Sequence, residues 1–182
     1  MAVTLTQNQQ EELMQEALTE AKRGMADGEA PIGCVIALCD EGTPRIVARG
    51  YNRVNGLQRK MAHAEIVAFE NAGGGDGKEP TLPLDAKEVI LVSTLEPCVM
   101  CLGAAMEAGV ATVLFGLEAP ADNGTTRVKA PESPESVAPT ITGGILAQES
   151  RHLFEQWLDG KEGTEQAKFV EQLLALTKNR AT

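Results

Sequence analysis

Two cysteines, Cys98 and Cys101, lie three positions apart directly after a proline in the segment TLEPCVMCLGAAM (94–106). In a chain with four cysteines, such a pair can form a disulfide, act as a redox couple or hold a metal ion. The N-terminal segment has no basic start followed by an apolar run, so we expect a cytoplasmic protein. Because cytoplasmic thiols stay reduced, this expectation disfavours a disulfide.

The segment MAHAEIVAF supplies a third donor, His63, and two positions later a carboxylate, Glu65. We predict that His63, Cys98 and Cys101 come together from the starts of two helices, each of which follows a strand. Cysteines at i and i+3 of a helix can point at one ion, and a helix N-terminus favours the thiolate that a metal requires. Two thiolates with one imidazole suit Zn²⁺.

A fourth protein ligand would make the site structural rather than catalytic. His152, the other histidine, belongs to a predicted C-terminal helix. Cys34 and Cys39 fall within or beside an apolar strand and are more simply small core residues. No further residue pairs with the set at zinc-finger spacing, so we predict that water occupies the fourth position, as in catalytic zinc sites.

Glu65 indicates what such a site would do. Zinc lowers the pKa of a bound water from 15.7 to about 7, and a neighbouring carboxylate can take the proton and deliver it to a leaving group. Alone, Glu65 would be an ordinary acidic residue at a helix N-terminus. Beside His63 and the downstream PCVMC, the proton-carrying role is favoured.

Hydrophobic periodicity and turn residues predict the elements that must position these side chains. Thr6 and Gln9 have the spacing of a capping box at the start of the first helix. Pro97 should occupy the first position of the helix that carries the cysteines. The predicted elements are, in order, a helix ending near Gly28, a hairpin of strands 32–38 and 44–50, a helix from about 62 to 73, a strand 88–94, the cysteine helix, a strand 111–117, an irregular segment 118–144, and helices 145–158 and 164–177.

This order predicts an α/β fold in which strands joined through helices pair in parallel, while the leading hairpin adds an antiparallel edge. The length of 182 residues suits one domain, with a unit at 1–158 that carries the predicted zinc site and a helical extension of the same domain at 159–182. No stretch approaches the roughly 18 apolar residues of a membrane span, so no membrane partner is expected.

The net charge of −10 argues against a large polyanionic partner. Residues 45–60, RIVARGYNRVNGLQRK, are an exception, because the run contains five basic residues and no acid. It can be a solvated strand and loop, or a face that binds nucleic acid.

His63, Glu65 and the PCVMC segment match the H-x-E…P-C-x-x-C signature of zinc deaminases. Through APIGCVI (30–36), GYNRV (50–54), AHAEIVAFENAGG (62–74), TLEPCVMCLGAAMEAGVATVLFG (94–116) and ITGGILAQESRHLFEQWL (141–158), the chain resembles the cytidine deaminase-like superfamily. It is most similar to the branch of bacterial tRNA adenosine deaminases, guanine deaminases and fungal-type cytosine deaminases.

The resemblance implies a three-layer α/β/α sandwich around a mixed five-stranded sheet, assembled as a homodimer. It also implies that Asn52 hydrogen-bonds the substrate base and that the backbone around Ala64 and Glu96 lies against it.

Two features depart from the tRNA and guanine enzymes. Residues 59–61 read Arg-Lys-Met where those enzymes carry Asp-Pro-Thr, and the 118–144 segment is longer than in the tRNA enzymes.

Three functions follow as hypotheses. The first is a zinc-dependent hydrolytic deaminase of a free base or nucleoside of the guanine, cytosine or adenine type, which the acidic charge favours. The second is a tRNA-specific adenosine deaminase that binds tRNA through the basic run. The third is a non-catalytic zinc protein, which the intact Glu65 disfavours. The 118–144 segment either shapes the pocket with Asp122 or Asn123 or is a mobile surface loop.

Overall fold

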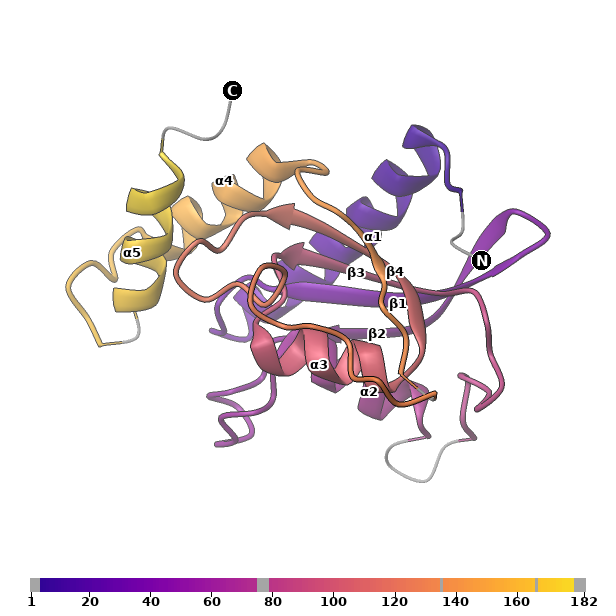
Figure 1. Cartoon of the computed structure of the whole chain (residues 1–182). Coiled ribbons are helices and arrows are strands. Elements are labelled where there is room, and N and C mark those ends of the chain that lie inside the picture. The colour runs from indigo at the N-terminus through magenta and orange to yellow at the C-terminus, as the bar shows by residue number, and fades with distance from the viewer. Residues whose placement is uncertain (1–3, 75–78, 135, 166, 179–182) are drawn as a thin grey trace.

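The computed structural model describes residues 4–74, 79–134, 136–165 and 167–178 of the chain. Its helices and strands follow the predicted order closely (Figure 1). They are α1 (Gln7–Ala26), β1 (Gly33–Asp40), β2 (Thr43–Tyr51), α2 (Ala64–Ala72), β3 (Val89–Leu95), α3 (Val99–Glu107), β4 (Val110–Leu117), β5 (Thr140–Thr142), α4 (Ala147–Leu158) and α5 (Lys168–Thr177).

The five strands form one mixed sheet in the order β2-β1-β3-β4-β5, which confirms the predicted fold class. β1 pairs antiparallel with both β2 and β3, whereas β3, β4 and β5 run parallel. The expectation that 118–144 is irregular throughout is wrong, because β5 lies within it. A strand of three residues, of which two are exposed, carries no alternation that a sequence could display.

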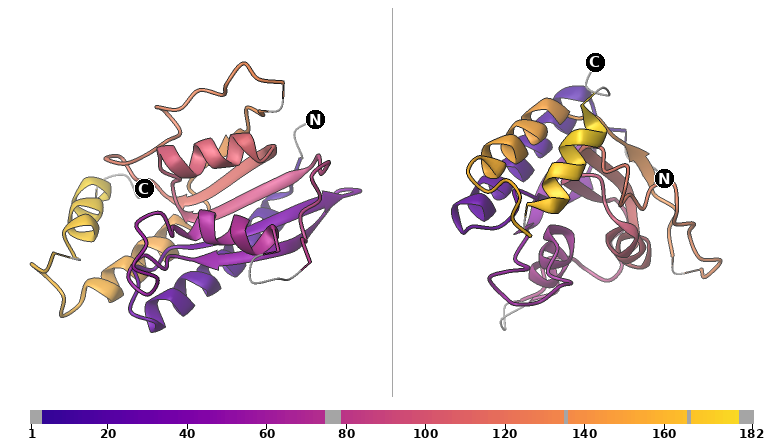
Figure 2. Two further views of the ribbon diagram at one scale, coloured as in Figure 1. Left: turned by 90° about the horizontal axis from the view of Figure 1, so that it is seen from below. Right: turned by 90° about the vertical axis from the view of Figure 1, so that its left-hand side faces the viewer.

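Helices cover both faces of the sheet (Figure 2). Ile90 and Val92 of β3 face a core that includes α1 and Leu153 of α4. Their neighbours Val89 and Leu91 face the opposite core, which is built with α2 and α3. This alternation is expected of a strand buried on both faces and gives the three layers. α5 packs across one end of the sheet with α4 and the last residues of β3 and β4.

The sequence predicted the starts of two helices in detail, and one of them, at α3, carries part of the candidate site. At α1, the Thr6–Gln9 capping box is present as predicted. At α3, the N-cap is Cys98 and the first helical residue is Val99, so the assignment of Pro97 to the first helical position is wrong. The proline precedes the cap and orients the chain into it, whereas the cap itself is a cysteine.

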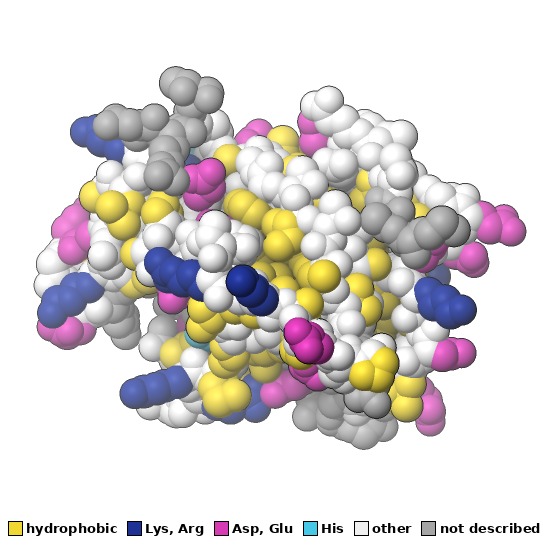
Figure 3. All heavy atoms as spheres, in the orientation of Figure 1, with side chains coloured by type: hydrophobic (Ala, Val, Ile, Leu, Met, Phe, Trp, Pro, Cys, Tyr) yellow, Lys and Arg dark blue, Asp and Glu magenta, His cyan; other side chains and the backbone are white. Residues whose placement is uncertain are grey.

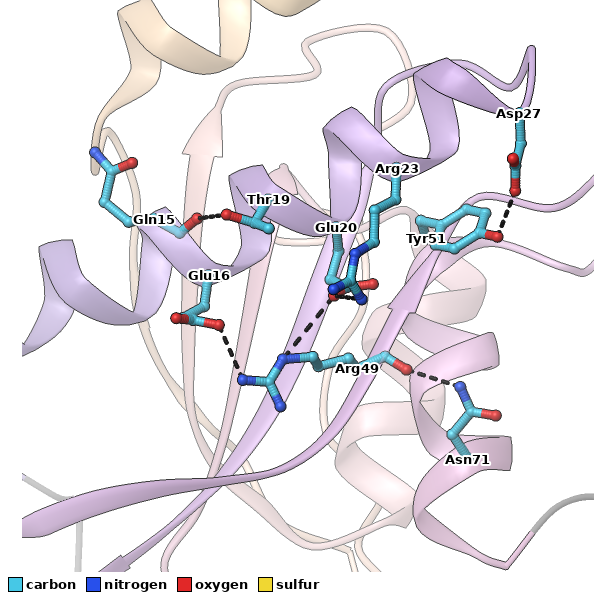
Figure 4. Close-up of polar contacts among 9 residues, drawn as sticks. All are labelled: Gln15, Glu16, Thr19, Glu20, Arg23, Asp27, Arg49, Tyr51 and Asn71. Atoms are coloured by element: carbon cyan, nitrogen blue, oxygen red, sulfur yellow. Dashed lines mark hydrogen bonds and ion pairs between the residues drawn. The ribbon is translucent and has the colours of Figure 1, made fainter.

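The basic run at 45–60 is partly engaged within the fold (Figure 4). Arg49 Nη2 lies 2.9 Å from Glu16 Oε2 of α1, and Arg49 Nε lies 3.9 Å from Glu20. Arg59 Nη2 lies 2.6 Å from Glu70 Oε2 of α2. These two arginines therefore connect the edge strand and its loop to the flanking helices.

None of the helices in the described ranges combines the length and apolarity needed to cross a bilayer.

Gly33 allows α1 to lie directly on β1. A Cβ at this position would fall 2.1 Å from the backbone oxygen of Ala17 and 2.3 Å from the backbone nitrogen of Ala21. Because both neighbours are main-chain atoms of a packed helix, neither can move aside.

We expect Gly33→Ala to lower the free energy of unfolding by about 2–3 kcal/mol, the usual range for overpacking in a core. Gly103→Ala is the matched control, since a Cβ at this helical position meets nothing within 4 Å and should stabilise α3 by about 0.5–1 kcal/mol. Urea denaturation of both variants measures the difference. Equal midpoints would contradict the close approach of α1.

Candidate metal centre and active site

Three donor atoms from two helix starts converge at one end of the sheet. His63 Nδ1 lies 3.6 Å from Cys98 Sγ and 3.6 Å from Cys101 Sγ, and the three atoms are all within 4.8 Å of one another. A nitrogen at about 2.0 Å and a sulfur at about 2.3 Å from a tetrahedral Zn²⁺ are roughly 3.5 Å apart. The spacing and chemistry of the donors therefore fit this ion.

Local backbone structure fixes these donors. His63 and Cys98 are the N-cap residues of α2 and α3, and both have extended backbone with no side-chain capping bond. Their side chains therefore point away from their own helices and are available to a ligand. Cys101 follows one turn later on α3 and is 1% exposed, whereas Cys98 and His63 are partly buried.

The pKa values of the two thiols shift in opposite directions. A hydrogen bond from the Cys101 thiol, opposed by burial and assisted by His63, lowers the pKa of Cys98 to about 4. The same bond and burial raise the pKa of Cys101. The hydrogen bond to Cys98 is also the main reason that the pKa of His63 is raised. Binding of a metal to all three donors requires loss of these protons.

Glu65 lies in the first turn of α2 and is 4% exposed. Its Oε1 accepts a hydrogen bond of 3.2 Å from the Ser93 hydroxyl of β3. Burial is the main cause that raises its pKa, and hydrogen bonds from its own backbone N–H and from Cys101 oppose that rise. The carboxylate thus sits beside the donor set in a site screened from bulk water.

A cavity of about 310 Å³ opens onto this group. Such a volume is at the lower end for small-molecule sites. Its walls combine the donors His63 and Cys98 and the carboxylate Glu65 with polar and apolar side chains of several elements, namely Ala30, Ile32, Asn52, Val54, Asn55, Leu95, Glu96, Asp122, Trp157 and Phe169.

The three residues expected to contact a base lie near the cavity in different ways. Asn52 lines it and is 7% exposed. Ala64 is fully buried in the core beneath α2, and it is not one of the residues that line the cavity. Glu96 lines it, but both of its side-chain oxygens accept hydrogen bonds from the following loop, one from the backbone N–H of Ala119 at 2.9 Å and one from the Thr125 hydroxyl.

The first part of the 118–144 segment packs onto the start of α3. Asp122 lines the cavity, and burial together with the charge of Cys98 raises its pKa. Asn123 forms an isolated backbone bridge with Cys98, and the Gly124 N–H donates to the Pro97 carbonyl at 2.7 Å. Asp122, rather than Asn123, is therefore the residue of this segment that reaches the cavity.

Sequence reasoning missed two aromatic side chains. Trp157 of α4 and Phe169 of α5 line the cavity. In the sequence, both belong to regular apolar faces of helices and carry no sign of a site. Only the packing of α5 against α4, which includes a hydrogen bond of 2.6 Å from Arg151 Nη1 to Thr177 Oγ1, brings them there.

Comparison with known proteins identifies the family. Residues 7–117 match the model of the cytidine and deoxycytidylate deaminase zinc-binding region. The chain belongs to this deaminase family. With the fit of the donor set, membership confirms Zn²⁺ as the cofactor.

Individual relatives and solved structures that resemble the chain differ in their named activities. A tRNA-specific adenosine deaminase of Streptococcus pyogenes is 38% identical over 103 residues, which are 57% of this chain and 59% of that protein. A solved structure from studies of A-to-I editing by tRNA:A34 deaminases has a TM-score of 0.60 at 28% identity. The match covers 78% of this chain and 98% of the solved chain. A guanine deaminase from Nitrosomonas europaea (TM-score 0.63, 23% identity, 81% and 83% coverage) shares the fold.

The two histidines of the deaminase chain provide a test of the metal centre. We expect purified protein to contain zinc at a ratio close to one per chain and His63→Ala to lose most of it, because two thiolates alone leave the tetrahedral set incomplete. His152→Ala is the control, since its side chain is 65% exposed on α4. Metal analysis by mass spectrometry measures both variants. Full zinc content in His63→Ala would contradict the assignment.

Proposed function

We propose that this chain is a zinc-dependent hydrolytic deaminase that acts on an adenine-type base in tRNA. The observation that carries the deaminase proposal is the buried Glu65 carboxylate beside the His63, Cys98 and Cys101 donors on the wall of a cavity. The tRNA substrate is supported by the 38% identity to a tRNA-specific adenosine deaminase. This similarity favours tRNA over the free base or nucleoside that net charge alone favours.

In the proposed reaction, His63, Cys98 and Cys101 hold Zn²⁺, which when bound lowers the pKa of a water by several units. Glu65 accepts one proton of a water whose oxygen bonds to the amino-bearing ring carbon, and delivers that proton to the amino group. Glu65 then carries the second proton of the water from the new hydroxyl to the adjacent ring nitrogen. The carbon–nitrogen bond breaks, ammonia leaves, and a carbonyl remains on the ring. Asn52 and the backbone near Ala64 and Glu96 hold the base in place.

Two positive side chains lie next to residues that line the cavity. Arg53 directly follows Asn52, is exposed, and lies 6.0 Å from the Tyr51 ring centroid. Lys161 lies 4.9 Å from the ring centroid of Trp157, which lines the cavity. Cations at these places can contact the phosphates on either side of a base that enters the cavity.

A free base is the second candidate. It is supported by the small aromatic-walled cavity, which α5 closes on one side, and by the net charge of −10. The same cavity chemistry serves both substrates, because an aromatic wall stacks on any base.

A homodimer in the cytoplasm stays a prediction. Apolar side chains at the exposed Leu57, Met61 and Val99 support the dimer. Figure 3 shows apolar side chains gathered across the middle of one face of the molecule. Contiguous exposed apolar surface of this kind is typical of protein interfaces.

Glu65→Gln should bind zinc as the natural chain does but lower kcat by about 10²–10⁴, because the amide keeps the shape of the carboxylate and cannot carry the proton. Glu70→Gln is the matched control on the same helix, since Glu70 pairs with Arg59 at the surface. Turnover and zinc content are measured on both variants. Retention of more than about a tenth of the natural kcat in Glu65→Gln would exclude the proton-carrying role.

The substrate is tested with a tRNA anticodon stem-loop, free bases and nucleosides. We expect conversion of adenosine to inosine in the stem-loop, with affinity that falls by about 0.7 log units per log of salt for each phosphate contact. Arg53→Ala should reduce that slope by about one contact. Arg45→Ala removes the same charge from the other end of β2, near its turn with β1, and should not reduce it. Activity on free bases alone, insensitive to salt, would support the second candidate instead.

A further inference from the structure

A carboxylate outside the proposed reaction is buried behind the loop that carries Asn52. Glu29 lies in the turn between α1 and β1 and is 2% exposed. A buried carboxylate is costly unless its oxygens accept hydrogen bonds. Glu29 therefore needs partners, and their identity indicates what it does.

All four described hydrogen bonds to Glu29 come from one loop, residues 52–56, between β2 and α2. Oε2 accepts from Asn52 Nδ2 at 3.0 Å, and from the backbone N–H and Nδ2 of Asn55 at 3.3 and 3.2 Å. Oε1 accepts from the Gly56 N–H at 2.6 Å. An ionised carboxylate offers acceptors alone, and each of these partners is a donor, so the set is complementary.

The bond to Asn52 has a consequence for the cavity. A side-chain amide has a donating end and an accepting end, and a rotation about its last torsion exchanges them. The Glu29 carboxylate can pair only with the donating end. Nδ2 of Asn52 therefore lies on the Glu29 side of the amide, and Oδ1 is the opposite end of a side chain that lines the cavity together with His63 and Glu65.

We propose that Glu29 is a positioning residue that fixes the Asn52 amide so that Oδ1 accepts a hydrogen bond from the substrate. The matching substrate group is a donor: an amine, a ring N–H or a ribose hydroxyl. The proposal deepens the deaminase function proposed above and rests on it for the nature of the occupant. It predicts that the substrate group next to Asn52 is a hydrogen-bond donor rather than an acceptor.

A purely structural role is the competing explanation, because Glu29 also ties down Asn55 and Gly56. A double-mutant cycle separates the two. Glu29→Gln keeps the shape of the side chain but adds a donating end, which permits either orientation of the Asn52 amide. We expect KM for the substrate that the natural chain converts to rise about three- to tenfold, as for the loss of one hydrogen bond between uncharged groups, with a smaller change in kcat.

In an Asn52→Ala background, Glu29→Gln should change kcat/KM less than about twofold, because its effect passes through the missing amide. The same factor in both backgrounds would overturn the proposal and leave Glu29 a structural residue. Glu12→Gln is the matched control, since Glu12 Oε1 accepts from Asn8 Nδ2 at 2.7 Å on the exposed face of α1.

The orientation of the Asn52 amide can also be tested on the natural chain, without an activity assay and without a variant that must fold. In proton–nitrogen NMR spectra, the Asn52 side-chain amide protons should exchange with water much more slowly than those of the exposed Asn8. Where Glu29→Gln folds, it should shift the Asn52 signals and leave those of Asn8 in place. Exchange of Asn52 as fast as that of Asn8 would overturn the proposal. If the proposed deaminase function is wrong but the role of Glu29 is right, the chain will convert none of the substrates and the Asn52 amide protons will still exchange slowly.

Discussion

The candidate chemistry depends on the meeting of two helix N-termini at one end of the sheet. His63 caps α2 and Cys98 caps α3, and neither side chain is used in a capping hydrogen bond, so each helix start contributes a donor to the site. The approach of α2 to the sheet is set by Gly50, where a Cβ would lie 2.5 Å from the backbone nitrogen of Ala68. A side chain there would push α2 outward and separate His63 from the two sulfurs.

The loop after β4 depends on the same meeting point. Glu96 accepts hydrogen bonds from Ala119 and Thr125, and Gly124 lies so close to Cys98 that a Cβ would fall 2.7 Å from the Cys98 carbonyl oxygen. The loop consequently packs against the start of α3, and its Asp122 lines the cavity. A segment without periodicity is ordered here by contacts to the site rather than by its own local structure.

The sequence contains the reactive centre almost completely, because ligand chemistry is expressed as residue type and short spacing. His63, Glu65, Cys98 and Cys101 could be named from these alone, and strands as apolar as β3 and β4 could be located. Glu29, Trp157 and Phe169 could not, because each belongs to an ordinary turn or helix face and reaches the site only through packing between elements distant in sequence. β5 is too short to produce a pattern, and the distinction between Pro97 and Cys98 as the start of α3 depends on dihedral angles at a single residue.

The contact between His63 and Cys98 joins residues 35 positions apart. A metal ion bound there acts as a cross-link that closes this length of chain and is absent from the unfolded state. The native state is then favoured by mass action, by about 1.4 kcal/mol for each tenfold rise of free zinc above the dissociation constant. We therefore expect the stability of this fold to rise with the concentration of free zinc, so the ion needed for the chemistry also helps to hold the native structure together.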